Sequence, residues 1–351
     1  MNHEVNASTD SLNEAPPGCS DEFARDLLRR VFHIDGRATQ LACERDQIFT
    51  VKTRSGTGFI LRLINPAEDR QVTNFQTKAL LHLNNVVPDY PVPRVIRDAN
   101  GEAEIEVSLP DGRLSIARLI TLLPGVVLAT MPERNPGVRA SMADHIAKLD
   151  LAFSDFNHPA ADHELLWDMK QALTLRKLLP YLKDRNTRRL VEQGLEAFED
   201  NVAPVQSKLR AQVIHNDFNF SNVMLDEQRA QITGVLDFGD MVFAPLIYDL
   251  AVALSYQFSG DDDDAGQIIT EFTHRYHRIV PLQRQELELL CDLITTRQVL
   301  SLLIAHWRAS LYPENARYIL RNSTISRVGI ERLAALDRGA LTLALIDRCL
   351  G

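Results

Sequence analysis

The stretch at 213–253 constrains the fold more than any other part of the chain. It contains three short apolar runs, at 213–214, 222–225 and 232–236, which are separated by polar loops and a turn. Branched apolar residues in short runs between polar loops are typical of strands, and a rigid sheet can hold functional side chains at its strand ends. The sequence therefore predicts a β-hairpin whose ends present polar residues for chemistry.

Polar side chains cluster around this predicted hairpin. Asp237 and Asp240 follow it, and the loop before it holds His215, Asp217, Asn219 and Asn222. One hairpin can bring Asn222 and Asp237 side by side, because these two residues flank its paired strands. Two oxygen donors beside a free carboxylate suit Mg²⁺, which proteins hold with few ligands together with substrate phosphates. The pattern favours a metal site that also meets a phosphate.

Three motifs in this stretch carry a resemblance to a known family. They are H-x-D-x4-N at 215–222, L-D-F-G-D at 236–240 and Y-D-L-A at 248–251. The first motif alone is moderately specific, but the three together are strongly so. The chain resembles the aminoglycoside phosphotransferase family of small-molecule kinases, which are relatives of protein kinases and include choline, homoserine and hydroxylysine kinases. The D-F-G-D-M motif at 237–241 is most similar to the hydroxylysine-kinase branch.

The resemblance implies an α+β, protein kinase-like fold with two lobes. A small β-rich lobe at 20–123 would bind the nucleotide, and a mostly helical lobe at 124–351 would hold the catalytic residues and the acceptor. From 139 onward the apolar residues recur with helical periodicity, which agrees with a helical second lobe. Residues 1–19 are polar and lack periodicity, so we expect a disordered tail there.

The hydrophobic pattern also predicts individual strands and helices. Ser20 is expected to cap the first helix, since two acidic residues follow it. The expected strands lie at 47–53, 58–64, 105–107 and 114–123, and the expected helices lie at 20–32, 67–83, 140–152, 165–182, 187–198, 266–277, 283–307, 313–322 and 328–349.

The resemblance assigns chemical roles to the polar residues around the hairpin. Asp217 is implied to be the catalytic base, or the group that aligns the acceptor hydroxyl, in a phosphoryl transfer. Asn222 and Asp237 are implied to hold Mg²⁺. An isolated Asp more often caps its own loop, but the motif around Asp217 favours the catalytic interpretation. His215 is expected to orient the loop, and Asp249 to anchor it by accepting backbone N–H bonds.

In the small lobe, Arg62 is the residue expected to bind nucleotide phosphates. The resemblance places it where protein kinases have Lys, and its guanidinium can chelate phosphate oxygens. The alternative is an exposed cation on a strand edge. The predicted helix at 67–83 has Gln76 where a Glu often pairs with the strand cation. A Gln can hydrogen-bond Arg62 but cannot neutralise it, which departs from the usual ion pair.

The segment at 118–125 resembles the hinge between the lobes of a kinase. The resemblance implies that backbone groups of Thr121 and Leu123 read the adenine edge of ATP, with GTP as an alternative nucleotide. An ordinary strand exit ended by Pro-Gly is the competing interpretation.

Composition excludes several classes of partner. Acidic residues outnumber basic ones, 47 against 38, which disfavours a nucleic-acid partner. No apolar run approaches the roughly 20 residues that span a bilayer, and the first residues do not read as a secretory signal. The four cysteines lack metal-ligand spacing and agree with a reducing cytosol. We therefore expect a cytoplasmic protein that meets neither membrane nor nucleic acid.

Two further features of the sequence are compatible with either a substrate-binding role or a structural role. The acidic run at 261–264 suits an aminated substrate, but adjacent like charges more often form a solvated loop or helix start. Four large side chains on predicted helices of the second lobe are candidates to enclose a cationic amine through cation–π contacts, or simply to pack in the core: Trp167, Trp307, Tyr256 and Arg297.

The sequence predicts an ATP- and Mg²⁺-dependent kinase that phosphorylates a hydroxyl of a small metabolite, either a hydroxylated amino acid or an amino alcohol. An antibiotic of the aminoglycoside type is the rival acceptor. A pseudokinase that binds a nucleotide and acts through partners is the rival class, suggested by Gln76 and Arg62. The presence of Asp217, Asn222 and Asp237 favours the enzyme. A protein kinase proper is disfavoured, because the spacing from 237 to 249 leaves no room for an activation loop.

Overall fold

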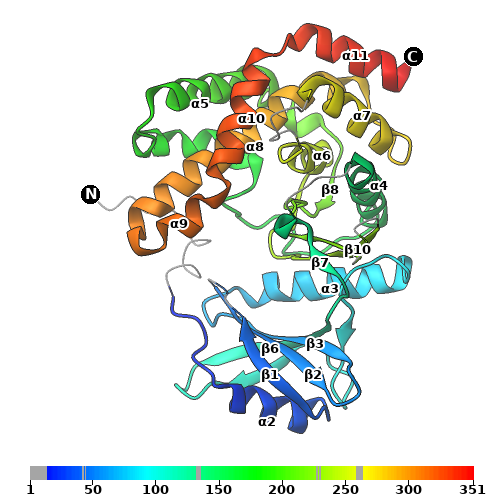
Figure 1. Ribbon diagram of the computed structural model, residues 1–351, viewed down its shortest axis with the longest axis vertical. Helices are drawn as coiled ribbons and strands as arrows, with labels where there is room; N and C mark the ends of the chain where they lie inside the picture. Colours follow the sequence, from blue (N-terminus) through cyan, green and yellow to red (C-terminus); the bar gives the residue numbers. More distant parts are fainter. Residues whose placement is uncertain are drawn as a thin grey trace.

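The computed structural model describes residues 14–41, 43, 45–131, 136–226, 228, 231–257 and 264–351. A sheet with two helices forms one end of the molecule, and a larger, mostly helical body forms the other (Figure 1). The expected α+β, protein kinase-like fold with a small and a large lobe is confirmed. Of the expected disordered tail at 1–19, residues 1–13 lie outside the described residues. The lobe boundary at residue 123 stays a prediction.

The small lobe is built on an antiparallel sheet with the strand order β1-β2-β3-β6-β4, and β5 also pairs with β6. The predicted hairpin is confirmed, with Gln47 opposite Leu63. The first strand has no counterpart among the sequence predictions, because Ala38 is its only buried residue and the alternation that identifies a half-buried strand is missing. The strands are β1 (Gly36–Leu41), β2 (Gln47–Thr53), β3 (Gly58–Leu63), β4 (Val95–Ile96), β5 (Ile105–Ser108) and β6 (Leu114–Thr121).

Helix α2 (Asp21–Val31) covers one face of this sheet (Figure 1). As expected, Ser20 caps it, and its hydroxyl oxygen accepts a hydrogen bond from the backbone N–H of Phe23. The buried side of the helix, which includes Leu27 and Leu28, packs with the sheet residues of one hydrophobic cluster. Burial of this face holds the helix on the sheet, since short helices are marginal in water without tertiary packing.

Helix α3 (Arg70–Val86) lies between the sheet and the large lobe (Figure 1). It begins three residues later than predicted, because Asp69 caps its N-terminus with a side-chain oxygen. Its buried residues Phe75, Ala79 and Leu83 belong to the hydrophobic cluster of the large lobe. The helix therefore joins the two lobes by packing, although it precedes the last strands of the small lobe in sequence.

The large lobe surrounds one long helix, α8 (Arg284–Leu311), which is buried over most of its middle. The other helices are α4 (Pro136–Ala152), α5 (Arg185–Ala197), α6 (Ile247–Leu254), α7 (Ala265–His277), α9 (Ala316–Ile319), α10 (Ser323–Ala335) and α11 (Arg338–Leu350). Shorter turns link them, namely 3-10 segments at Leu128–Thr130, Gln206–Lys208, Pro313–Asn315 and Leu320–Asn322, and a π turn at Phe198–Val202.

The structure corrects three of the predicted helices. The segment predicted as a helix at 165–182 forms 3-10 turns at Met169–Tyr181, and it contains Pro180, which cannot continue a regular helix. The single helix predicted at 328–349 is wrong, because the chain breaks at Leu336 and Asp337 caps a new helix there. The segment predicted as one helix at 313–322 is divided into a 3-10 turn, the one-turn helix α9 and a second 3-10 turn.

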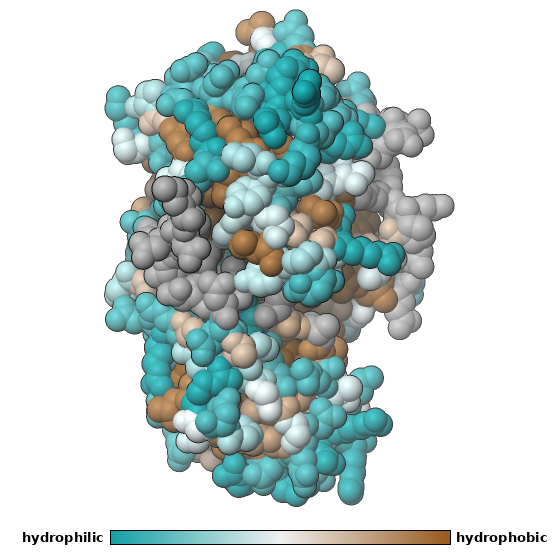
Figure 2. Space-filling model, turned by 90° about the vertical axis from the view of Figure 1, so that its left-hand side faces the viewer, coloured by the Kyte–Doolittle hydropathy of each residue, from teal (hydrophilic) through white to brown (hydrophobic). Residues whose placement is uncertain are grey.

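Helix length and surface polarity bear on the expected absence of a membrane span. In the part of the chain that the structure describes, no helix is both long and apolar enough to cross a bilayer. The coloured atoms of the face shown in Figure 2 are mostly hydrophilic, and the apolar side chains among them are scattered. Single exposed apolar residues are normal for a folded protein.

Two small antiparallel sheets stand between the helices of the large lobe. Strand β8 (Ala211–Ile214) pairs with β11 (Val242–Pro245), and β9 (Val223–Leu225) pairs with β10 (Ile232–Val235). Strand β7 (Val126–Val127) adds to the free side of β9. The predicted hairpin between 222 and 236 is confirmed by this register, and its polar ends form the site described below.

The chain that leaves β6 for the large lobe is fixed directly to the β9–β10 hairpin. The hydroxyl of Thr233 donates to the carbonyl of Pro124 at 2.7 Å. Gly125 has a φ of +111°, and a Cβ at this position would lie 2.2 Å from the carbonyl oxygen of Leu225. Only glycine accepts both this backbone conformation and this close approach.

We expect Gly125→Ala to lower the free energy of unfolding by more than about 2 kcal/mol. The backbone conformation alone costs an alanine roughly 1–3 kcal/mol, and its Cβ must also displace the backbone of Leu225. Gly101→Ala is the matched control, since Gly101 has a φ of +86° but no atom within 4 Å of an added Cβ. Chemical denaturation measures both variants. Equal losses would show that the close approach at Gly125 adds nothing.

Candidate active site

A buried carboxylate holds the loop that contains Asp217. Asp249, in the first turn of α6, accepts hydrogen bonds from the backbone N–H of His215 at 2.8 Å and of Asn216 at 2.7 Å. Asn216 has a φ of +62°, in the left-handed region that Asn tolerates better than most residues. The loop is therefore bent around the carboxylate. The predicted anchoring role of Asp249 is confirmed.

A second carboxyl group lies behind Asp249 and was not singled out by the sequence. Asp150 of α4 is fully buried, touches Asp249 and accepts a hydrogen bond from the hydroxyl of Tyr276. Its other oxygen has no hydrogen-bond donor among the described residues. Burial and the charge of Asp249 raise the pKa of Asp150 well above its ordinary value. A protonated Asp150 satisfies both oxygens, because its hydroxyl donates to Asp249.

Near pH 4, we expect Asp150→Asn to have a free energy of unfolding within about 1 kcal/mol of the wild type, because an amide can donate to Asp249 and accept from Tyr276. The folded-state pKa of Asp150 lies above its unfolded value, so the wild type loses stability as pH rises from about 4. The variant lacks this loss of stability. Its free energy of unfolding should therefore increase relative to that of the wild type as the pH rises. Urea denaturation between pH 5 and 9 measures the difference.

Asp150→Ala is the contrasting variant. It leaves the buried hydroxyl of Tyr276 without an acceptor, which costs about 1–3 kcal/mol. It also takes away the donor to Asp249. A constant difference between Asp150→Asn and the wild type over the pH range would show that Asp150 does not hold a proton in the folded protein.

Three side chains donate hydrogen bonds to the carboxylate of Asp217. Its Oδ1 accepts from Asn219 Nδ2 at 2.8 Å and from Arg297 Nη2 at 3.2 Å, and its Oδ2 accepts from Asn222 Nδ2 at 2.7 Å. The carboxylate is thus fixed in one orientation by donors from both sides. Such an arrangement suits a group that must meet a reacting atom in a defined geometry.

The environment of Asp217 also changes its acidity. Burial raises the pKa of Asp217 to about 7, and the charges of Asp240 and Asp237 act in the same direction, while Arg297 opposes them. The side chain is still 19% exposed, so a small molecule in the solvent can reach it. A carboxylate whose pKa lies near neutrality is well matched to proton transfer at physiological pH.

The structure brings Asn222 next to the strand end that carries Asp237. The backbone N–H of Leu236 donates to the carbonyl of Asn222 at 2.8 Å, directly beyond the last pair of the hairpin. His215 ties this strand end to the preceding loop, since its Nε2 bonds the carbonyl of Leu236 at 3.0 Å and its Nδ1 accepts from the N–H of Asp217 at 3.3 Å. His215 therefore orients the loop, as expected.

Asn222 and Asp237 offer oxygen atoms that fit a hard divalent cation. The amide nitrogen of Asn222 bonds both the carbonyl and the carboxylate of Asp217, so its Oδ1 is the end left for a cation. Asp237 is exposed at a φ of +57°, and its Oδ1 accepts from the N–H of Gly239 at 3.1 Å. No group of three or more His, Cys, Asp or Glu side chains suited to a metal occurs among the described residues. One carboxylate and one amide oxygen suit an ion completed by phosphate.

Arg62 has a carboxylate partner that the sequence analysis did not identify. Its Nε forms an ion pair with Asp46, which stands just before β2 and also accepts from the N–H of Asn65 at 2.8 Å. Burial alone would lower the pKa of Arg62, but the charges of Asp46 and Asp237 raise it above its ordinary value. Arg62 is thus held as a cation on the side of the cleft that faces Asp237.

The hydrogen bond suggested between Gln76 and Arg62 is not formed. The side-chain oxygen of Gln76 accepts from Arg118 Nη2 at 3.3 Å, and its nitrogen donates to the carbonyl of Gly239 at 3.4 Å. Arg118 is the residue opposite Arg62 on the neighbouring strand, and burial followed by the charge of Arg62 lowers its pKa to about 10. An amide at Gln76 links this strand to the Gly239 loop, while Asp46 neutralises Arg62.

Arg45 adds a second cation to this side of the cleft. Its Nη2 lies 3.4 Å from Asp240 Oδ1, and the two residues come from different lobes. Arg45, Arg62 and Gly239 line the same small pocket. The sequence offered one signal for these contacts, the charged pair Arg45-Asp46 before a strand, but no local pattern tells which distant group such a pair meets.

The predicted adenine-reading groups are only partly available. The backbone N–H of Thr121 donates to the carbonyl of Arg94 at 2.9 Å, and the hydroxyl of Thr121 accepts from the N–H of Arg94. Thr121 can therefore offer only its carbonyl to a nucleotide. Leu123, after the end of β6, is half-buried, and its N–H donates no hydrogen bond within the described part of the chain.

The residues considered for an amine site are used differently. The ring of Trp167 already faces a cation, because the guanidinium carbon of Arg297 lies 5.2 Å from the ring centre. Of the acidic run at 261–264, residues 261–263 lie outside the described residues, and Asp264 caps α7 by accepting from the N–H of Gln267. These observations favour structural roles for Asp264 and for the ring of Trp167.

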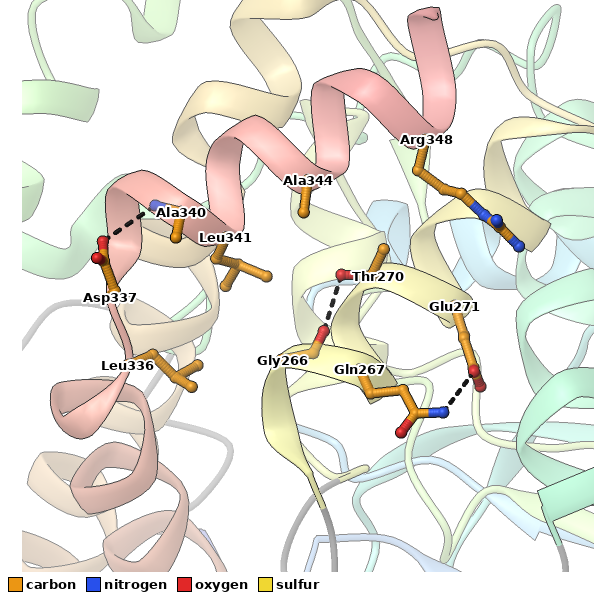
Figure 3. A pocket seen from close by; sticks show the side chains of 10 residues that line it. All are labelled: Gly266, Gln267, Thr270, Glu271, Leu336, Asp337, Ala340, Leu341, Ala344 and Arg348. Atoms are coloured by element: carbon orange, nitrogen blue, oxygen red, sulfur yellow. Dashed lines mark hydrogen bonds between the residues drawn. The ribbon is translucent and has the colours of Figure 1, made fainter.

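A separate hollow lies between α7 and α11, away from the predicted site residues (Figure 3). Leu341 and Ala344 of α11 face Thr270 of α7, and Gln267 bonds Glu271 along the rim at 2.8 Å. The polar groups drawn there bond along their own helices and do not converge on a common point. The hollow holds no counterpart to the arrangement around Asp217.

Comparisons with known proteins identify the family of the chain. A family model described as the phosphotransferase enzyme family matches residues 39–311. Hydroxylysine kinase of Mus musculus is 25% identical over 342 residues, which is 90% of this chain and 89% of that protein. The solved structure of a microcompartment-associated aminopropanol kinase has a TM-score of 0.69 at 18% identity, over 90% of this chain and 98% of that one. An amicoumacin kinase solved with AMP-PNP, Ca²⁺ and Ami has a TM-score of 0.66 at 14% identity, over 92% and 97%.

The family model spans well over half of the chain, and it includes every predicted site residue from Arg62 to Asp237. The resemblance inferred from the three motifs is thereby confirmed. The chain belongs to the phosphotransferase enzyme family and is a small-molecule kinase with a hydroxyl acceptor.

Proposed function

We propose that this kinase transfers the γ-phosphate of ATP to a hydroxyl of a small hydroxylated amino acid or amino alcohol. The observation that carries the proposal is the fixed carboxylate of Asp217 beside the oxygen donors Asn222 and Asp237, opposite the cation Arg62. A base, a metal site and a phosphate-binding cation around one cleft are the parts that phosphoryl transfer needs.

Asp217 Oδ2 is the proposed proton acceptor. Each carboxylate oxygen can accept two hydrogen bonds. Oδ1 already accepts from Asn219 and Arg297, whereas Oδ2 accepts only from Asn222 and keeps one position for the acceptor hydroxyl. As the hydroxyl oxygen bonds to the γ-phosphorus and the bond to the ADP oxygen breaks, the hydroxyl proton passes to Asp217.

Asn222 Oδ1 and Asp237 are the proposed ligands of Mg²⁺. When bound, the ion supplies positive charge that offsets the charge developing on the transferred phosphate. Arg62, kept in place by Asp46, binds the phosphate oxygens from the small lobe. The carbonyl of Thr121 and the N–H of Leu123 read the adenine. GTP is the alternative nucleotide, because backbone groups alone do not choose strongly between purines.

The acceptor class rests on the likeness to hydroxylysine kinases, which extends over most of both chains. The aminopropanol kinase structure agrees with an amino alcohol, and the acidic balance of the chain agrees with a cationic acceptor. An antibiotic acceptor is the second candidate, favoured by the similar fold of an amicoumacin kinase. A pseudokinase is the weakest candidate, because Arg62 has a carboxylate partner in Asp46 despite the Gln at position 76.

A direct screen tests the proposal. The purified protein is incubated with ATP or GTP, Mg²⁺ and one acceptor at a time, and the products are followed by mass spectrometry. The panel contains hydroxylysine, homoserine, choline, aminopropanol and several aminoglycosides. Phosphorylation of a hydroxylated amine or amino acid supports the proposal, and phosphorylation of antibiotics alone supports the second candidate. Nucleotide binding without transfer to any acceptor would leave the pseudokinase.

A further inference from the structure

Arg297 is a buried cation in the middle of the longest helix. It lies on α8, its side chain is 2% exposed, and its neighbours along the helix are almost all buried. Burial of a charged group is costly unless the group is paired and hydrogen-bonded. A guanidinium in this position therefore requires a partner that compensates for its loss of water.

The partners of Arg297 are the active-site carboxylate, the hydroxyl of Tyr256 and one tryptophan. Its Nη2 donates to Asp217 Oδ1 at 3.2 Å, and its Nη1 donates to the backbone carbonyl of Trp167 at 3.1 Å. The ring of Trp167 lies against the guanidinium at 5.2 Å. The Nε is buried without a hydrogen-bond partner among the described residues. Trp167 thus fixes the plane of the guanidinium, and Asp217 receives its one ion pair in the described chain.

A buried ion pair that only stabilises the fold is expected to have its polar atoms satisfied by hydrogen bonds. Here the cation is buried with one donor left over, while its carboxylate is 19% exposed and carries two further donors, Asn219 and Asn222. The guanidinium is therefore better suited to orient the carboxylate than to hold the core together.

We propose that Arg297 is a positioning residue that fixes the Asp217 carboxylate, with Trp167 as the support that fixes Arg297. Arg297 fills the second acceptor position of Oδ1, which leaves Oδ2 directed to the acceptor hydroxyl. The proposal rests on the proposed role of Asp217 in phosphoryl transfer. It adds a residue that lies 80 positions away in sequence and outside the motifs of the family resemblance.

The first variant is Arg297→Met, which keeps the length of the side chain and removes the charge. We expect kcat to fall about 10- to 100-fold, since a slight misplacement of a catalytic group has effects of this size. The KM for ATP should stay within about three-fold of the wild type, because Arg297 touches no nucleotide-binding group. Arg284→Met is the matched control at the exposed start of the same helix, where Arg284 only approaches Glu288 at 3.9 Å. It should leave both constants unchanged.

A double-mutant cycle separates positioning from a general effect on the fold. In the Asp217→Asn background, Arg297→Met should lower the residual kcat by less than about two-fold, because the group that it positions is gone. Equal factors in both backgrounds, or an unchanged kcat in Arg297→Met, would overturn the proposal. Where Arg297→Met does not fold, Arg297→Gln takes its place with the same two criteria, since it also removes the charge but can still donate to the buried carbonyl of Trp167.

A separate measurement distinguishes failure of the proposed function from failure of the proposed role of Arg297. Turnover by the wild type on the acceptor panel decides whether the chain is a kinase of that class, before any variant is compared. The ratio of variant to wild type, measured on whichever acceptor is turned over, decides the role of Arg297. Added guanidinium should restore part of the kcat of Arg297→Ala, whereas urea, its neutral analogue, should not. Equal effects of the two additives would count against positioning by charge.

Discussion

Asp217→Asn is expected to lower the turnover number by a factor on the order of 10² or more, with nucleotide binding largely kept. The amide cannot take the proton of the acceptor hydroxyl. It also cannot accept from all three donors around it, because one of its two ends carries hydrogens where Asn219, Asn222 and Arg297 also present hydrogens. Steady-state kinetics with the best acceptor measures the loss, and titration calorimetry with ATP measures the binding.

Asp155→Asn is the control for Asp217→Asn. Its carboxylate is 78% exposed and only approaches His82, so the same chemical change there should alter neither quantity. A turnover number within a few-fold of the wild type in Asp217→Asn would remove Asp217 from the catalytic role. Loss of nucleotide binding in this variant would instead point to a distorted cleft, since Asn222 is held through Asp217.

Asp237→Ala is expected to abolish Mg²⁺-dependent nucleotide binding. The substitution removes the only carboxylate assigned to the metal and places an alanine at a φ of +57°, which an aspartate tolerates better. In the absence of Mg²⁺, nucleotide binding should be at least as strong as in the wild type, because one negative charge near Arg62 is gone. Calorimetric titrations with and without Mg²⁺ measure the two cases.

Asp237→Asn separates the charge from the backbone conformation. Asparagine accepts the left-handed conformation and can keep the hydrogen bond from Gly239, but it lacks the negative charge. We expect it to fold like the wild type and to lose most of the Mg²⁺ dependence. Normal Mg²⁺-dependent binding in both variants would show that the metal is held elsewhere.

The parts of the site that the sequence predicted are those that local geometry determines. Asn222 and Asp237 flank one short hairpin, and pairing of its strands is sufficient to bring them together. Asp249 follows at the start of a helix, where its carboxylate can reach the backbone of the preceding loop. The resemblance to a family supplied the roles, and the strand pattern supplied the proximity.

The parts that sequence reasoning missed depend on contacts between distant segments. The ion pair of Arg62 with Asp46 joins strand β3 to the residue before β2, and the contact of Arg297 with Asp217 joins α8 to a loop 80 positions earlier. Periodicity places each residue on its own element but not opposite its partner. The same limit explains the hydrogen bonds of Gln76, whose partners Arg118 and Gly239 lie in different lobes.

The predictions of helix boundaries were wrong for a more local reason. At Asp337 the apolar pattern continues across the break, so a single helix is the simplest interpretation, yet the side chain of Asp337 accepts from the N–H of Ala340 and starts a new helix. Strand β1 was not predicted, because its one buried residue, Ala38, gives no alternation of buried and exposed positions.

The close approach of Gly125 to Leu225 has a consequence for which lengths of nucleotide the proposed site can accept. Leu123, which we propose to contact adenine, is joined to the β9–β10 hairpin by the Thr233–Pro124 hydrogen bond and by the pairing of β7 with β9. The proposed positions of the base and of the phosphates are therefore held at a fixed separation. A nucleotide with a shorter phosphate chain can occupy one of these positions, but it cannot occupy both.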